Sequence, residues 1–74
     1  MEKILEILRE IRPDVDFENE KLLIDDGILD SFDILAIVGN LNEAFDVEIK
    51  VDDLEPANFN SAEAMKKLIE KLQE

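Results

Sequence analysis

The sequence predicts a small all-α bundle of three main helices and one short helical turn, formed by residues 1–74 as a single domain. Three segments repeat apolar residues at intervals of three and four, the spacing that places them on one side of an α-helix. Capping residues and prolines mark where these segments begin and end. With 74 residues and no cysteine, the chain has room for only a thin core and cannot form a disulfide.

The first helix is predicted over residues 1–12, and Pro13 ends it because the residue before a proline disfavours helical backbone. Its apolar side comprises Met1, Ile4, Leu5, Leu8 and Ile11. A long connection follows over residues 13–29. Apolar residues recur along it, so we expect it to pack on the helices by its own side chains. These residues are Val15, Phe17, Leu22, Leu23, Ile28 and Leu29.

We expect the second helix to begin at Asp30, as its N-cap, and to end at about Phe45. Asp33 adds a second acidic side chain in the first turn, where the helix dipole favours negative charge. Leu29 and Ile34 flank the cap and match the positions of a hydrophobic staple. The apolar stripe comprises Ile34, Val38, Leu41 and Phe45, with Leu35 and Ile37 beside it.

Residues 46–51 alternate polar and apolar side chains, so a strand is the alternative to an extended linker there. One strand would have no partner, and we therefore expect a linker, followed by a short helical turn over residues 52–55. The last helix is predicted to be capped by Asn60, with Glu63 completing a capping box. Its apolar stripe comprises Ala62, Met65, Leu68, Ile69 and Leu72.

The 20 acidic and eight basic residues give a net charge of −12, and the excess lies in the middle of the chain. Residues 14–33 hold eight acidic residues and one lysine, a net of −7, whereas the two terminal helices are balanced. Such a field repels nucleic acid and anionic membranes and attracts basic partners. Solubility alone is the simpler explanation of the same charge.

The residue types that the chain lacks exclude several classes of function. Without histidine or cysteine, the chain lacks the commonest general base and a thiol nucleophile, so we predict that it is not an enzyme. The first dozen residues are charged and amphipathic, and no run is long enough to span a bilayer. We therefore expect a cytoplasmic protein that does not insert into membranes.

The stretch "DGILDSFDIL" places Ser31 at the first position of the second helix. The backbone N–H groups at a helix start have no intrahelical partner, and the helix dipole there favours a phosphate. Ser31 therefore suits a serine that carries a phosphodiester, although an ordinary serine beside a cap is the alternative. A serine-protease role is excluded because no histidine is present to act as the base.

"GILDSFD", followed by a helix, "AFDVEI" and "FNSAEA", resembles the acyl carrier and peptidyl carrier protein family over nearly the whole chain. In that family a phosphopantetheinyl transferase attaches 4′-phosphopantetheine to the serine matched by Ser31. The aspartate matched by Asp30 helps the transferase hold its magnesium. The resemblance implies a monomeric carrier that holds acyl or aminoacyl groups as thioesters. Its implied partners are that transferase, an acyl- or aminoacyl-activating ligase and downstream transferases.

Two positions differ from the fatty-acid type of carrier. Phe32 stands where that type has leucine, and Ala36 where it has a glutamate used for docking. With fewer acidic residues than the fatty-acid type, the predicted second helix is similar to that of D-alanyl carrier proteins. We therefore expect an adenylated amino acid or other carboxylic acid as cargo, with a fatty-acid or polyketide carrier as the alternative. The residues predicted to contact partners on the exposed side of the helix are Phe32, Asp33, Ala36, Gly39 and Glu43.

Alternatives remain open for several of these residues. Phe32 can instead belong to the core, and Gly39 can instead allow close packing against a neighbouring helix. The whole chain can be an unmodified acidic interaction module. A calcium-binding helical domain is a further alternative, because residues 14–25 place acids at loop positions 1, 3, 5, 7 and 12. The EF-hand pattern has glycine at loop position 6 and glutamate at position 12, where this chain has Asn19 and Asp25. These differences favour an ordinary acidic loop.

Overall fold

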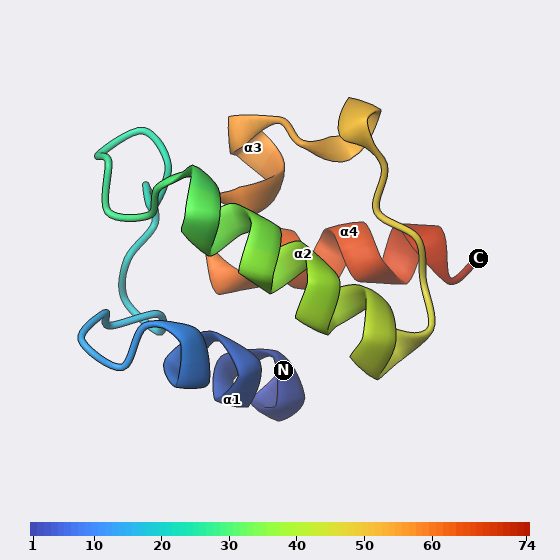
Figure 1. Ribbon diagram of the computed structural model, residues 1–74, viewed down its shortest axis with the longest axis horizontal. Helices are drawn as coiled ribbons and strands as arrows, with labels where there is room; N and C mark the ends of the chain where they lie inside the picture. The colour runs from blue at the N-terminus through green and yellow to red at the C-terminus, as the bar shows by residue number, and fades with distance from the viewer.

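A computed structural model describes all 74 residues and confirms the small all-α bundle (Figure 1). The main helices are α1 (Glu2–Ile11), α2 (Ser31–Phe45) and α4 (Ala62–Leu72). Two short elements, the 3₁₀-helix η1 (Val51–Asp53) and α3 (Pro56–Phe59), lie between α2 and α4, where one turn was predicted. In the view of Figure 1, α2 runs diagonally with α1 on one side and α3 on the other. Helix α1 packs against both α2 and α4.

The ends of the first two main helices follow from local sequence. Arg12 ends α1, with its N–H donating to the Leu8 carbonyl at 2.9 Å, and Pro13 follows directly, as predicted. Helix α2 begins with a reciprocal capping box: Asp30 Oδ1 accepts the Asp33 N–H at 2.9 Å, and Asp33 Oδ2 accepts the Asp30 N–H at 3.1 Å. This arrangement confirms Asp30 as the N-cap and satisfies two backbone donors at the start of the helix.

The core contains 14 buried residues, all of them apolar, contributed by the three main helices, α3 and the connections. Each fully buried leucine stabilises the fold by about 2 kcal/mol relative to an exposed one. The long connection packs as expected, because Phe17, Leu23 and Leu29 are buried. Leu22 does not, since 46% of it stays exposed. None of the helices is both long and apolar enough to cross a membrane.

The apolar stripe of α2 is rotated from its predicted position. Ile37 and Leu41 are the buried residues of the helix, whereas Ile34, Val38 and Phe45 are only partly buried. Leu35 is 64% exposed. Because α2 carries apolar side chains on most of its circumference, its pattern does not define one side, and contact with the rest of the bundle selects it.

Asn60 has a different role from the predicted cap. Helix α4 is capped instead by Ser61, whose Oγ accepts the Ala64 N–H at 3.0 Å. The Asn60 Oδ1 accepts the N–H groups of Ile24 at 3.0 Å and Asp25 at 3.1 Å. The Asn60 carbonyl accepts the N–H of Leu23 at 2.9 Å. Asn60 therefore fastens the long connection to the junction of α3 and α4, and the predicted capping box with Glu63 is wrong.

The segment between α2 and α4 is an extended linker followed by the two short elements. Residues 47–50 form no strand, which confirms the linker. The Asn42 Oδ1 accepts the Ile49 N–H at 2.9 Å, and Ile49 is buried, so the linker is held against α2. The expected turn at 52–55 begins one residue earlier, as η1. Pro56 opens α3 at the first helical position, where its missing N–H costs nothing.

Replacing Asn60 by alanine is expected to lower the free energy of unfolding by about 2 kcal/mol, because two loop N–H groups lose their acceptor. Urea denaturation followed by circular dichroism measures this change. Asn40→Ala is the matched control: the Asn40 side chain is exposed and bonds only the Ala36 carbonyl of its own helix. A similar loss of stability in both variants would contradict the fastening role of Asn60.

Candidate functional site

The candidate site is centred on Ser31, the first residue of α2. Ser31 is exposed and follows Asp30, whose extended backbone (φ −106°, ψ −176°) directs the chain into the helix. The N–H groups of Ser31 and Phe32 have no hydrogen-bond partner in the chain, whereas those of Asp33 and Ile34 are bonded to Asp30. A hydroxyl group therefore stands at the positive end of a 15-residue helix, beside two free amide donors.

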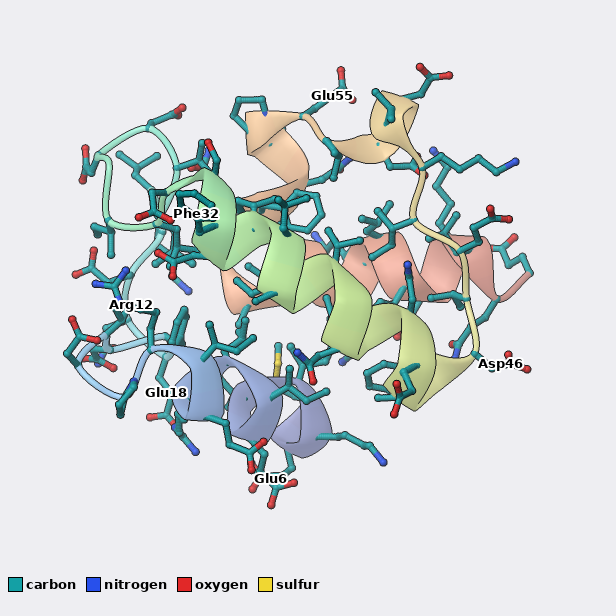
Figure 2. All side chains as sticks on the ribbon, viewed as in Figure 1. Glu6, Arg12, Glu18, Phe32, Asp46 and Glu55 are labelled. Carbon is teal, nitrogen blue, oxygen red and sulfur yellow. The ribbon has the colours of Figure 1, made fainter.

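Arg12 holds the start of α2 in place through hydrogen bonds of its guanidinium group. Its Nη1 donates to Asp33 Oδ2 at 2.6 Å and to the Ile28 carbonyl at 3.2 Å, and its Nε and Nη2 donate to the two carboxylate oxygens of Asp14 at 3.0 and 2.9 Å. Figure 2 shows Arg12 at the junction between the end of α1 and the start of α2, where Phe32 is labelled. Sequence analysis missed Arg12, because its partner Asp33 lies 21 residues away and no local pattern links the two.

This contact also changes the electrostatics of the acidic connection. The hydrogen bonds from Arg12 hold the pKa of Asp14 below its ordinary value. The same guanidinium has its own pKa raised further above its ordinary value by the hydrogen bonds to Asp14 and Asp33. Two of the eight carboxylates counted in residues 14–33 therefore share one permanent positive charge.

An apolar groove with a volume of about 510 Å³ opens beside Ser31. A smaller hollow of about 80 Å³ shares three of its lining residues and extends it towards α3. Sequence analysis missed the groove because Ile24 lies in the predicted long connection and Leu54 in the predicted short turn, both outside the helix that carries Ser31. The lining residues of the larger groove are Ile24, Leu29, Asp30, Ser31, Ile34, Leu35 and Leu54.

Most of the residues predicted to contact partners lie on the exposed side of α2. Phe32, Ala36, Gly39 and Glu43 are exposed, and Phe32 is 82% exposed, which excludes a place in the core. A side chain added at Gly39 would meet no atom within 4 Å, so Gly39 does not serve close helix packing. Asp33 is the exception.

Only 14% of the Asp33 side chain is exposed, because the capping box and Arg12 turn it inward. Its predicted place on the exposed side of α2 is therefore wrong. Two apolar residues that were not proposed as contacts are also exposed. Leu35 lies next to the groove, and Val51 is even more exposed than Leu35.

Three carboxylates of the segment considered as a calcium loop have separate partners. Asp14 contacts Arg12, Asp16 accepts from the Asn19 side chain, and Glu18 pairs with Arg9 at 3.0 Å. No group of three or more histidine, cysteine, aspartate or glutamate side chains is arranged to hold a metal ion. The loop geometry therefore gives the calcium alternative no support.

We compared the chain with models of protein families, with curated proteins and with solved structures, and found no match in any of the three comparisons. The site is therefore interpreted from its own residues and their surroundings. Those are an exposed serine at a helix start, an aspartate cap beside it and an apolar groove adjoining both.

Gly39→Ala is expected to raise the free energy of unfolding by about 1 kcal/mol, because alanine favours the helix and its methyl group meets nothing. Gly27→Ala is the matched control. Its added methyl group also meets nothing, but Gly27 has φ +70°, so alanine there should cost about 1 kcal/mol. Urea denaturation of both variants tests the pair, and a destabilised Gly39→Ala variant would contradict the open surface at this position.

The contact between Arg12 and Asp14 predicts a defined pH dependence. The pKa of Asp14 is lowered in the folded chain, so protonation favours the unfolded chain. The contact therefore stabilises the fold above the ordinary aspartate pKa of about 4, and this contribution is lost as the pH falls through the lowered folded-state pKa. Titration of the Asp14 carboxyl by NMR should give a higher pKa in Arg12→Gln. The same titration in Arg9→Gln should leave it unchanged.

Proposed function

We propose that this chain is a carrier protein that bears 4′-phosphopantetheine on Ser31 and presents thioester-linked groups to partner enzymes. The observation that carries the proposal is the exposed Ser31 hydroxyl at the first position of α2, directly beside an apolar groove. The "GILDSFD" motif and its resemblance to acyl and peptidyl carriers support it. When attached, the group supplies a thiol that can hold an acyl or aminoacyl cargo.

The residues around Ser31 suit such a group. Only two side chains of the chain carry a hydroxyl, Ser31 and Ser61, and the Ser61 hydroxyl is engaged in capping α4. The free N–H groups of Ser31 and Phe32, together with the helix dipole, favour a phosphodiester at this place. The groove offers apolar surface for a flexible chain attached to the serine.

Asp30 suits the recognition role that the resemblance implies. One of its carboxylate oxygens accepts the Asp33 N–H, and the other accepts no hydrogen bond from the chain. That second oxygen is free to meet a magnesium ion held by a phosphopantetheinyl transferase. In this proposal the chain is a substrate and carrier and catalyses no reaction itself.

The exposed side of α2 is the proposed docking surface for the transferase, for a loading ligase and for downstream transferases. It combines apolar Phe32 with Ala36 and Gly39, whose small side chains allow a close approach, and with acidic Glu43. The small and uncharged Ala36 favours an adenylated amino acid or other carboxylic acid as cargo. A fatty-acyl or polyketide intermediate is the second candidate cargo. A cytoplasmic location belongs to the same proposal.

Incubation with coenzyme A, magnesium and a promiscuous phosphopantetheinyl transferase should raise the intact mass of the chain by one phosphopantetheine group. Ser31→Ala should abolish this gain. Ser61→Ala is the control for the other hydroxyl and should keep it, although the loss of a cap destabilises the fold by about 1 kcal/mol. No gain with several transferases would refute the carrier function and favour an unmodified acidic interaction module.

A further inference from the structure

The guanidinium group of Arg12 forms hydrogen bonds to residues that lie before and after Ser31 in the sequence. Arg12 Nη1 contacts the carbonyl of Ile28, three residues before the serine, and the carboxylate of Asp33, two residues after it. The opposite edge of the same guanidinium is held by both oxygens of Asp14. Because the planar fork of arginine is fixed at both edges, Arg12 has little freedom to move relative to the start of α2.

The capping box links Arg12 to the backbone on either side of Ser31. Asp33 Oδ2 accepts from Arg12 at 2.6 Å and from the Asp30 N–H at 3.1 Å, and the Asp33 N–H returns a bond to Asp30 at 2.9 Å. The Arg12 and Asp33 side chains are 29% and 14% exposed, so water competes less for this pair than for a surface ion pair. Without Arg12, the inward Asp33 carboxylate would lose its only positive partner.

We propose that Arg12 is a positioning residue, which orders the start of α2 so that Ser31 is presented in one conformation to the enzyme that modifies it. This inference rests on the proposed carrier function. The contacts of Arg12 to Ile28 and Asp33 all fall within three residues of Ser31, and Arg12 is not part of the buried core. Its loss therefore disturbs the serine segment more than the bundle.

The expected consequence is a change in substrate affinity rather than in turnover. If only a fraction of the chains presents Ser31 correctly, the apparent affinity of the transferase for the chain falls to that fraction of its intrinsic value. Arg12→Gln should then raise the KM of the transferase for this chain about tenfold and leave kcat nearly unchanged. Arg12→Lys should fall in between, because an ammonium group cannot bridge Asp14 and Asp33 as a planar fork does.

The experiment combines loading kinetics with amide hydrogen exchange of the unmodified chain. In Arg12→Gln, the amides of Asp30, Asp33 and Ile34 should exchange about tenfold faster, while amides in the middle of α4 keep their rates. Arg9→Gln, three residues earlier in α1, is the matched control, because it removes the same charge but only an exposed pair with Glu18. It should change neither the exchange rates nor the KM.

Asp33→Asn tests the same network from the other side. It keeps an acceptor for the Asp30 N–H, removes the charge attraction to Arg12, and should raise the KM as Arg12→Gln does. Uniformly faster exchange over the whole chain, or a loading defect confined to kcat, would overturn the positioning role. If the wild-type chain is loaded and Arg12→Gln has an unchanged KM, the positioning role is overturned while the proposed function stands. Absence of loading in the wild-type chain would overturn the proposed function and the positioning role together.

Discussion

The contact between Arg12 and Asp33 joins the end of α1 to the start of α2, and the placement of Ser31 depends on it. Between these two helices lies a connection that carries seven of the 20 acidic residues but only one lysine, and it has no helix or strand of its own. Buried Phe17, Leu23 and Leu29 hold this connection against the core. Asn60 fastens its middle to the α3–α4 junction, and Arg12 fastens its end. The serine therefore stands on a rigid support rather than on a free loop.

The acidic charge does little to stabilise this arrangement. Only three ion pairs form among 20 acidic residues, and the pair of Arg9 with Glu18 is largely exposed. Exposed pairs contribute well under about 1 kcal/mol each, while the remaining carboxylates repel one another. On the proposed function, the unpaired negative charge around Ser31 would attract partners with basic surfaces.

How well each element could be predicted depends on whether the residues that determine it lie close together in the sequence. Helices α1 and α4 were predicted closely because each has one apolar and one charged side, and Asp30 was recognised because an aspartate cap and the acidic Asp33 in the first turn are local signals. The orientation of α2 was not predictable because its apolar side chains lie on most of its circumference. Asn60 and Ser61 are both good caps, and only the contact of Asn60 with the connection decides between them. The groove and the Arg12 contact depend on residues far apart in sequence, and so no local pattern indicated them.

On the proposed function, the two surfaces beside Ser31 serve different ligands. The groove lies on the side of α2 that faces Ile24 and Leu54, whereas Phe32 points away from the bundle, and Leu35 borders both. Burial of Phe32 and Leu35 by a partner would contribute about 4 kcal/mol, which the entropic cost of association, about 4 kcal/mol or more, largely offsets. Contacts between acidic side chains and a basic partner would add to this at a strength that depends on salt. Such binding is weak enough to release the carrier after each transfer, and the rigid helix start ensures that each short encounter meets Ser31 in the same place.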